Sequence, residues 1–305
     1  MGRPLAGDLD VCDNGYIEVE GGRVAYWRVG ESDKEPLVCL HGGPGLPHDY
    51  LEPLAALADE RPVLFYDQLG CGQSDRPEDS ELWVFERFVA ELGTVVNALG
   101  IEKFHLFGNS WGGWLALEYA VSDFPPPTSL AINGSPPSVP RIIEDNRKLR
   151  QDLPAEVREA LDRHEKSGYT TCPEYAAGVY EFYRRHLCRL CPWPDALDRS
   201  FAGLGTPVYE HMWGPTEFGP VTGLLKDWDF TERLGQVRQP TLVAIGRHDE
   251  ARPEHCAVLV DRIPNARAVF FDDSSHMPFH EEPEVFLSTV RDFISEHEAD
   301  SRQAN

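Results

Sequence analysis

A chain of 305 residues is long enough to bury one large domain, and its apolar runs stop at strand length, well short of the roughly 18 residues that span a membrane. Because 28 Lys and Arg face 51 Asp and Glu, the formal net charge is −23, which repels phosphate backbones and anionic membranes. The composition therefore predicts neither a nucleic-acid partner nor a membrane partner. The excess of acidic residues fits either binding of a cationic substrate or a well-solvated surface. Only the positions of individual carboxylates at a binding site distinguish these two explanations.

The start of the chain and its cysteines point to a cytoplasmic protein. Met1–Asp8 lacks the apolar stretch of a secretory signal, and Ala6 stands where a myristoylation motif has Ser or Thr. Seven scattered cysteines, an odd number, fit a reducing compartment better than a disulfide framework. Cys188 and Cys191 form a single C-x-x-C without the second pair that a zinc site needs, so we expect two ordinary thiols on one helix face and no metal.

Eight segments have the patterns of strands. Residues 16–20 and 23–29 alternate between apolar and polar side chains around Gly21-Gly22, which predicts a hairpin with one solvated face. The other segments are continuous apolar runs, which are typical of parallel strands buried on both faces. These runs are residues 37–40, 63–66, 104–107, 129–132, 241–245 and 268–271. The pattern predicts an α/β fold with a mostly parallel eight-stranded sheet that begins with an antiparallel hairpin.

Helical segments separate most of these strands, at residues 50–58, 81–99, 111–121, 254–262 and 283–296. The interval from 136 to 239 is different, because it holds helical segments (142–152, 155–167, 173–190 and 195–203) and no clear strand. We therefore expect a core in two parts, residues 1–135 and 240–305, and an inserted helical cap at residues 136–239. A cap over the carboxyl ends of the strands would shape the ligand pocket of an open α/β sheet.

A glycine-rich turn lies between the strand at 104–107 and the helix at 111–121. It has the pattern G-x-S-x-G, in Gly108-Asn109-Ser110-Trp111-Gly112. A strand, a tight turn and a helix in this order form a nucleophile elbow, which exposes the serine Oγ at the top of the sheet. The motif predicts that Ser110 attacks a carbonyl carbon. The alternative is a glycine-rich turn that only lets a helix pack on a strand.

A second glycine-rich loop follows the strand at 37–40, with the sequence His41-Gly42-Gly43-Pro44-Gly45. Acyl transfer needs N–H donors where the oxyanion forms, and elbow hydrolases take one from this loop and one from the residue after the serine. We therefore predict that the backbone N–H groups of Gly43 and Trp111 form the oxyanion hole. A plain Gly-Pro turn is the alternative.

A serine nucleophile needs a base, and the base needs an acid that fixes its tautomer. In an elbow fold the chain order is Ser, Asp, His, with the acid and the histidine after late strands. Asp249 follows the strand at 241–245 and His276 follows the strand at 268–271, so we predict Ser110, Asp249 and His276 as the catalytic triad. Glu250 is the rival acid, and the rival histidines, led by His280, are His41, His48, His105 and His248.

Several motifs together resemble one family. They are His41–Gly45, Tyr66-Asp67-Gln68 with Gly70–Ser74, Gly108–Gly113, Met212–Phe218 and Lys226–Asp229. The chain resembles the proline iminopeptidases, serine aminopeptidases of the α/β-hydrolase fold, and is most similar to the tricorn-interacting aminopeptidase branch. The likeness extends from Gly15 to about His297. Its most specific part is the cap segment, which general esterases lack.

The resemblance implies release of the N-terminal residue, often proline, from short peptides or aminoacyl small molecules, without a cofactor. It also implies that carboxylates hold the free amine, and those of the family match Glu217 and Glu250. A buried α-ammonium needs a fixed counter-charge, so the chemistry agrees with this assignment. The alternatives are a surface glutamate at 217 and a charge at a helix N-terminus at 250.

One departure widens the expected substrate range. Many proline iminopeptidases carry Asp-Gln-Arg-Gly where this chain has Leu69 in place of Arg, and broader relatives act on other apolar residues or on amino-acid amides. An amidase, esterase or tailoring hydrolase for a metabolite without a free amine is the alternative enzyme, and a ligand-binding pseudo-hydrolase is the non-enzymatic alternative. A dehalogenase or epoxide hydrolase would need Asp in place of Ser110. The sequence predicts no oligomeric state.

Overall fold

The structure is a computed structural model that describes residues 11–217 and 219–303, so Met1–Asp8 lies outside the described residues. The predicted α/β class is confirmed, because eight strands form one sheet in the order β1-β2-β4-β3-β5-β6-β7-β8. β1 pairs antiparallel with β2 and β2 with β4, and the remaining pairs are parallel. The strands are β1 (Val11–Val19), β2 (Gly22–Val29), β3 (Leu37–Leu40), β4 (Val63–Tyr66), β5 (His105–Asn109), β6 (Ser129–Asn133), β7 (Thr241–Gly246) and β8 (Ala266–Phe271).

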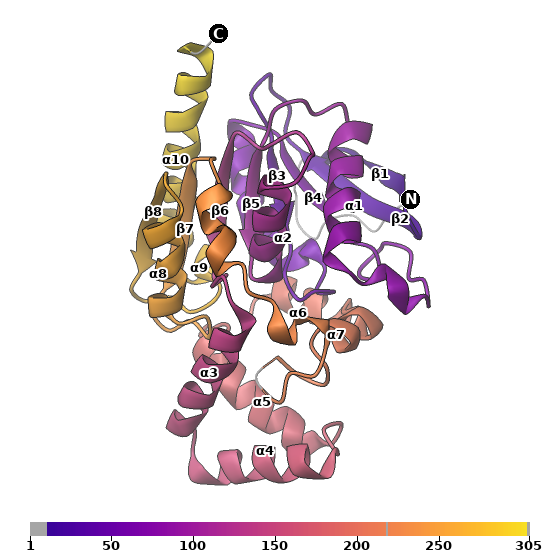
Figure 1. The fold of residues 1–305 in the computed structure, drawn as a ribbon, viewed down its shortest axis with the longest axis vertical. Helices are drawn as coiled ribbons and strands as arrows, with labels where there is room; N and C mark the ends of the chain where they lie inside the picture. The colour runs from indigo at the N-terminus through magenta and orange to yellow at the C-terminus, as the bar shows by residue number, and fades with distance from the viewer. Residues whose placement is uncertain (1–10, 218, 304–305) are drawn as a thin grey trace.

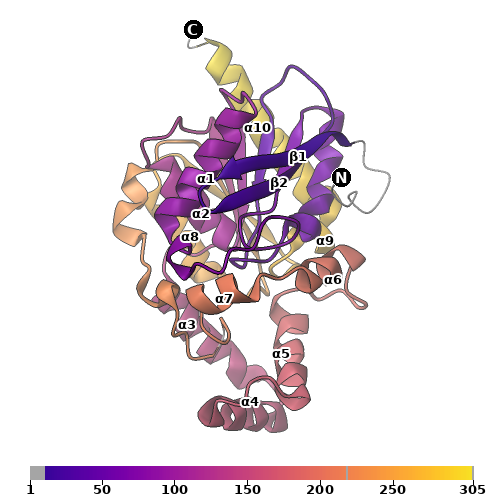
Figure 2. The same ribbon diagram turned by 90° about the vertical axis from the view of Figure 1, so that its right-hand side faces the viewer.

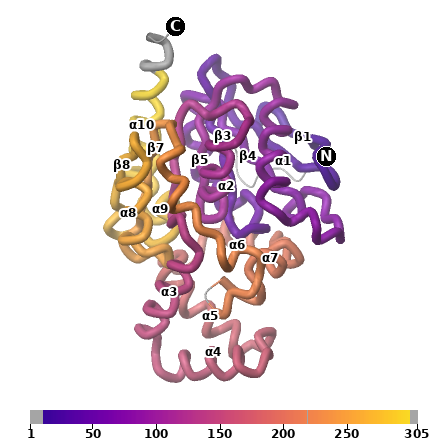
Figure 3. Tube along the Cα trace, viewed as in Figure 1, coloured from indigo at the N-terminus to yellow at the C-terminus, as the bar shows by residue number. Residues whose placement is uncertain are grey.

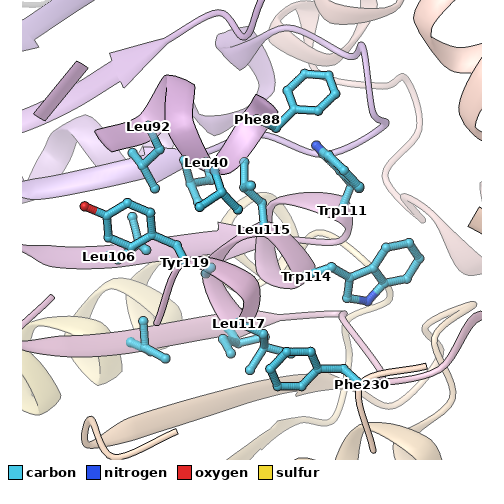
Figure 4. Close-up of a cluster of buried hydrophobic side chains, with 14 of the residues drawn as sticks. Leu40, Phe88, Leu92, Leu106, Trp111, Trp114, Leu115, Leu117, Tyr119 and Phe230 are labelled. Carbon is cyan, nitrogen blue, oxygen red and sulfur yellow. The ribbon is translucent and has the colours of Figure 1, made fainter. Parts of the chain in front are cut away.

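Alternate residues of the central strands enter two apolar cores, one on each face of the sheet. Val38 and Leu40 of β3 belong to the core that α1 (Phe85–Ala98), α2 (Trp111–Ala120) and α8 (Pro253–Arg262) cover. Leu37 and Cys39 belong to the core that η1 and α10 cover. Figure 4 shows part of the first core, where Trp111, Trp114 and Leu115 of α2 lie among Leu40, Leu106, Phe88 and Phe230. This double cover explains why the strands are continuous apolar runs.

The edge strand β8 corrects one expectation. The continuous apolar run at residues 268–271 predicted a strand that is buried on both faces. Most residues of β8 are at least partly exposed, and Phe270 is 39 % exposed. In the described sheet β8 is an edge strand that pairs with β7 alone, so one of its sides has no neighbouring strand. The guanidinium of Arg247 lies over the Phe270 ring, 4.2 Å from its centroid, and shields part of the exposed apolar surface.

The helices that flank the sheet match most of the predicted positions (Figures 1 and 2). The segment predicted as a helix at 50–58 is a 3-10 helix instead, and Pro53 inside it has no N–H for an α-helical ladder. The segment predicted at 81–99 is broken at Trp83 and Val84. These helices are η1 (His48–Asp59), η2 (Ser80–Leu82), α1 (Phe85–Ala98), α2 (Trp111–Ala120), α8 (Pro253–Arg262), α9 (Pro278–Glu281) and α10 (Pro283–Gln303).

Between β6 and β7 the described residues form helices and an isolated bridge from Ser138 to Asp229, with no strand. Figure 3 shows that α4 and α5 extend away from the sheet, while α6 and α7 return to it. α4 and α5 hold a small core of their own, which includes Leu161, Tyr175 and Phe182. The elements are α3 (Val139–Leu149), η3 (Arg150–Asp152), α4 (Ala155–Ser167), α5 (Pro173–His186), α6 (Asp195–Ala202), α7 (Thr206–Met212), η4 (Leu224–Asp227) and η5 (Thr231–Gln236).

The expectation that Cys188 and Cys191 share a helix face is wrong. α5 ends at His186, and Pro192 and Pro194 follow too closely for another helical turn. Cys188 is buried and Cys191 is exposed, and all seven cysteines are free thiols. Along the described chain no helix combines the length and the apolar character needed to cross a bilayer.

Candidate active site

Ser110 occupies a strained turn between β5 and α2. Its φ of 56° and ψ of −123° are unusual for a residue with a side chain, and among the described residues it is the one non-glycine with positive φ. The flanking glycines allow the strand and helix to approach this closely. A Cβ on Gly108 would lie 2.3 Å from the carbonyl oxygen of Gly112, and one on Gly112 would lie 2.2 Å from that of Leu40. The turn thus has the geometry of a nucleophile elbow.

The two predicted oxyanion donors belong to firmly held segments. Trp111 is the first residue of α2, where backbone N–H groups lack partners within the helix. Its indole Nε1 donates to Gln68 Oε1 at 2.8 Å, which fixes the start of the helix. Gly43 has a φ of 108°, and its carbonyl oxygen accepts a 2.6 Å hydrogen bond from Trp213 Nε1. The loop and the elbow are therefore both anchored by tryptophan side chains.

Tyr50 connects the same loop to the elbow. Its hydroxyl accepts from the Gly42 N–H at 2.7 Å and donates to Asn109 Oδ1 at 2.7 Å. Asn109 directly precedes Ser110, so one buried side chain fixes the distance between the glycine loop and the turn. This preorganisation is what stabilisation of a developing oxyanion requires.

Asp249 and His276 form a buried pair. His276 Nδ1 lies 2.8 Å from Asp249 Oδ1, which also accepts the Ala251 N–H at 2.8 Å. Burial alone would favour the neutral ring, but the charge and hydrogen bond of Asp249, with smaller contributions from Glu250 and Glu217, raise the pKa of His276 to about 9. When Nδ1 carries the proton shared with Asp249, Nε2 is the basic atom of the ring.

The rival histidines have other partners. His280 Nε2 donates to the Tyr50 carbonyl at 2.7 Å, and His48 Nδ1 pairs with Asp67 at 2.7 Å. His41 Nε2 accepts from the Gln68 N–H, the ring of His105 contacts Ser129 Oγ, and the side chain of His248 is exposed. The carboxylate of Glu250, the rival acid, forms no hydrogen bond with the His276 ring in the described part of the chain and lies beside Glu217. The geometry thus favours the predicted assignment over each alternative.

Gly134 is a site residue that the sequence did not identify. It directly follows β6 with a φ of 59°, and a Cβ there would lie 2.6 Å from His276 Nδ1 and 2.9 Å from Asp249 Oδ2. Only a glycine leaves room for the Asp249–His276 pair against the end of β6. Gly134 directly follows β6, which pairs with β5, the strand that Ser110 follows, but the sequence around it has no motif that marks a site residue.

Glu217 and Glu250 border the same cavity as Ser110 and His276, and its volume is about 410 Å³. Tyr183 donates its hydroxyl to Glu217 Oε1 at 2.8 Å, and the Glu217 N–H donates to Tyr209 Oη at 3.1 Å. Burial raises the pKa of Glu217. Burial and then the neighbouring Glu217 raise the pKa of Glu250 well above its usual range. Glu250 Oε2 is buried and has no hydrogen-bond partner within residues 11–217 and 219–303.

The remainder of the cavity wall is mostly apolar and comes from the helices between β6 and β7 together with the loop after β3. The sequence did not identify Tyr183 or Tyr209, because they lie within helices without a local motif. Apolar and aromatic wall residues include Leu46, Val179, Leu187, Trp193, Phe201 and Leu204. Such a wall excludes water and strengthens electrostatic interactions around the carboxylates.

Comparisons with known proteins agree with this geometry. Residues 35–283 match the family model described as alpha/beta hydrolase fold. A proline iminopeptidase of Heyndrickxia coagulans is 38 % identical over 283 residues, which cover 92 % of this chain and 98 % of that protein. The crystal structure of a proline iminopeptidase from Mycobacterium smegmatis is 41 % identical, covers 95 % of this chain and 100 % of that one, and has a TM-score of 0.87.

A further solved structure, that of VinJ, is 36 % identical, covers 94 % of this chain and 99 % of that one, and has a TM-score of 0.91. The matched range includes the elbow, the glycine loop and the residues after β7 and β8. The identity and coverage confirm the family that the sequence motifs indicated. The chain belongs to the proline iminopeptidase family of the α/β-hydrolase fold.

Proposed function

We propose that this protein is a serine aminopeptidase that releases an N-terminal residue, proline or another apolar residue, from short peptides or amino-acid amides. Its membership of the family supports the proposal. The observation that carries it is the buried Glu250 beside Glu217, in the cavity that Ser110 and His276 also border, because Glu250 Oε2 has no hydrogen-bond partner among the described residues. Unpaired buried carboxylates are unfavourable, and a substrate ammonium supplies the missing partner.

In the proposed reaction Ser110 Oγ attacks the first carbonyl carbon of the substrate while His276 Nε2 takes the hydroxyl proton. The backbone N–H groups of Gly43 and Trp111 donate to the resulting oxyanion, and Asp249 holds the His276 imidazolium. Collapse breaks the C–N bond, and His276 returns its proton to the leaving amine. Water, deprotonated by His276, then attacks the acyl-enzyme and releases the free residue and Ser110.

Glu217 and Glu250 limit the reaction to one residue. An α-ammonium has a pKa of about 8, so it carries a charge at neutral pH that must be balanced in a buried site. With the amine held by the two carboxylates, the carbonyl that reaches Ser110 is the one that follows the free amine. Tyr183 keeps the Glu217 carboxylate in position for this contact.

Residues 136–239 are proposed to form the cap over the active site, since helices of this interval supply much of the cavity wall. The proposed partners are short peptides or aminoacyl small molecules, and the net charge of −23 argues against nucleic acid. The seven free thiols support a reducing compartment, the cytoplasm.

The test compares three substrates: prolyl p-nitroanilide, N-acetyl-prolyl p-nitroanilide and p-nitrophenyl propionate, an ester without an amine. The free amine should raise kcat/KM by about 100-fold or more over the acetylated anilide. Equal rates for the two anilides would contradict amine binding and favour the amidase or esterase alternative.

Ser110→Ala should lower turnover of every substrate by a factor of about 10⁴ to 10⁶ while the protein stays folded. A fluorophosphonate probe should label the wild type at Ser110 and leave the variant unlabelled. Labelling elsewhere, or substantial turnover by the pure variant, would overturn the assignment of the nucleophile.

A further inference from the structure

Asn146 of α3 is a buried polar residue that the proposed reaction does not yet use. The residue is 1 % exposed. Its Nδ2 donates to the carbonyl oxygen of Glu217 at 3.4 Å, and because only the amide NH₂ can donate to a carbonyl, this contact fixes the orientation of the side chain. Oδ1 is then directed elsewhere, and it has no hydrogen-bond partner in the described part of the chain.

A small cavity of about 20 Å³ joins Asn146 to the reaction site. It is bordered by Ser110, Asn146, Glu217, Glu250 and His276, with Trp114 as one apolar wall. A space of this size holds one small group, such as a water molecule or the head of an ammonium ion. Two buried acceptors that have no partner among residues 11–217 and 219–303, Asn146 Oδ1 and Glu250 Oε2, belong to residues on its border, and Glu217 is the third acceptor residue.

The number of acceptors decides which amine fits. A primary α-ammonium has three N–H donors, whereas the secondary ammonium of N-terminal proline has two. Charge-assisted hydrogen bonds are the stronger ones, so the carboxylates of Glu217 and Glu250 take two donors from either substrate. The neutral amide oxygen of Asn146 is the acceptor that remains for a third donor, and it adds no charge to a site that already holds two acids.

Resting on the proposed aminopeptidase function, we propose that Asn146 Oδ1 accepts the third N–H of a primary α-ammonium. The site is therefore matched to N-terminal residues with a primary amine, such as alanine, and not to proline alone. Asn146 is a specificity-determining residue, because the buried oxygen stays unpaired when a secondary amine binds.

The experiment measures kcat/KM for alanyl, N-methylalanyl and prolyl p-nitroanilides, with p-nitrophenyl propionate as the substrate without an amine. Asn146→Leu keeps the number and branching of the side-chain heavy atoms and removes the acceptor. It should lower the alanyl rate by about tenfold or more, leave the N-methylalanyl and prolyl rates within about threefold or raise them, and leave the ester rate unchanged. Asn146→Ala should show the same selectivity if the Leu variant does not fold.

Ile142→Val is the matched control. Ile142 lies one turn earlier on α3 and borders the same small cavity, and its side chain has no polar atom. It should change the alanyl and N-methylalanyl rates by the same factor. An equal fall of both rates in Asn146→Leu would overturn the proposal and leave Asn146 as a support for Glu217, and no fall would also overturn it. If the wild type hydrolyses the ester but none of the anilides, the proposed function itself fails.

Discussion

Asp249 and Glu250 are neighbours in the chain, yet their carboxylates have opposite surroundings. Asp249 Oδ1 accepts from His276 Nδ1 and from the Ala251 N–H, so this carboxylate has a charge partner within the protein, while its buried Oδ2 has no hydrogen-bond partner among the described residues. Glu250 faces a second acid, Glu217, and its Oε2 has no partner among the described residues. One turn after β7 thus supplies an acid that pairs with His276 in the free protein and, in the proposed function, an acid that pairs with the substrate amine. Two adjacent residues can therefore have separate roles, Asp249 in the proposed catalysis and Glu250 in the proposed binding of the substrate amine.

The two acid sites are nevertheless coupled through His276. The charges of Glu250 and Glu217 add to that of Asp249 in raising the pKa of His276. A base with a raised pKa is more protonated at neutral pH and therefore less available. In the proposed complex a bound ammonium would offset the glutamate charges, so the substrate itself would shift His276 toward the neutral form that takes the Ser110 proton.

Among the variants that test this comparison, Asp249→Asn should cause the largest loss of activity. The amide cannot hold the reactive tautomer of His276 or balance the imidazolium, so kcat/KM should fall by about 10⁴-fold. The fall should be equal for prolyl p-nitroanilide and for p-nitrophenyl propionate, because the chemistry is common to both. A loss confined to the anilide would mean that Asp249 belongs to the amine site.

Glu250→Gln should distinguish amine binding from the chemistry at Ser110, because it should affect only the substrate with a free amine. Losing one of two buried charges opposite an ammonium should lower kcat/KM for prolyl p-nitroanilide by about 100-fold or more, while the ester rate stays within about threefold. Glu254→Gln is the matched control, since that side chain is 64 % exposed at the start of α8 and should change neither rate. Parallel losses on both substrates would contradict an amine-binding role.

The pH profiles should differ between the two substrates. Both rates should rise with pH as His276, with its pKa raised to about 9, loses its proton. Only the anilide rate should level off above the amine pKa of about 8 and then fall roughly tenfold per pH unit above the His276 pKa of about 9, because a neutral amine no longer pairs with the carboxylates. In Glu250→Gln the rising limb of the ester profile should move to lower pH, since a negative charge beside His276 is lost. If the rising limb of the ester profile did not move in this variant, the charge of Glu250 would not influence the pKa of His276.

Tyr183→Phe should give the smallest effect. The variant removes one hydrogen bond to Glu217 and keeps the ring, so kcat/KM for prolyl p-nitroanilide should fall by about three- to tenfold and the ester rate should hold. Tyr169→Phe, at an exposed tyrosine of the same helical region, is the control and should leave both rates unchanged. A larger loss on the ester would place Tyr183 in the chemistry of Ser110.

The sequence predicted the features that depend on local pattern. Continuous apolar runs located the strands of the sheet, and the G-x-S-x-G turn located the strained Ser110. Asp249 and His276 were predicted from their places after two strands, and the structure places their side chains 2.8 Å apart. The partial exposure of β8 was missed, since an apolar run does not reveal its place at the edge of the sheet.

Residues that reach the site by tertiary packing alone gave no signal. Tyr183 lies inside α5 and Asn146 inside α3, and each reaches Glu217 only through the tertiary packing of the helices between β6 and β7. Gly134 looked like an ordinary residue after a strand, and its role depends on His276, which lies more than a hundred residues later. Glu217 itself was expected from a family resemblance, because an isolated glutamate has no pattern of its own.

The hydrogen bond from Trp213 to the Gly43 carbonyl, across 170 residues of sequence, has a consequence for protein engineering. Exchanging residues 136–239 with the equivalent part of a relative is an obvious way to transfer substrate preference. Such a chimaera would also replace the indole that holds the glycine loop, and would slow the chemistry although the loop sequence is untouched. A graft that keeps Trp213 separates the change in substrate preference from the change in the glycine loop. The segment to exchange is therefore residues 136–239 without Trp213.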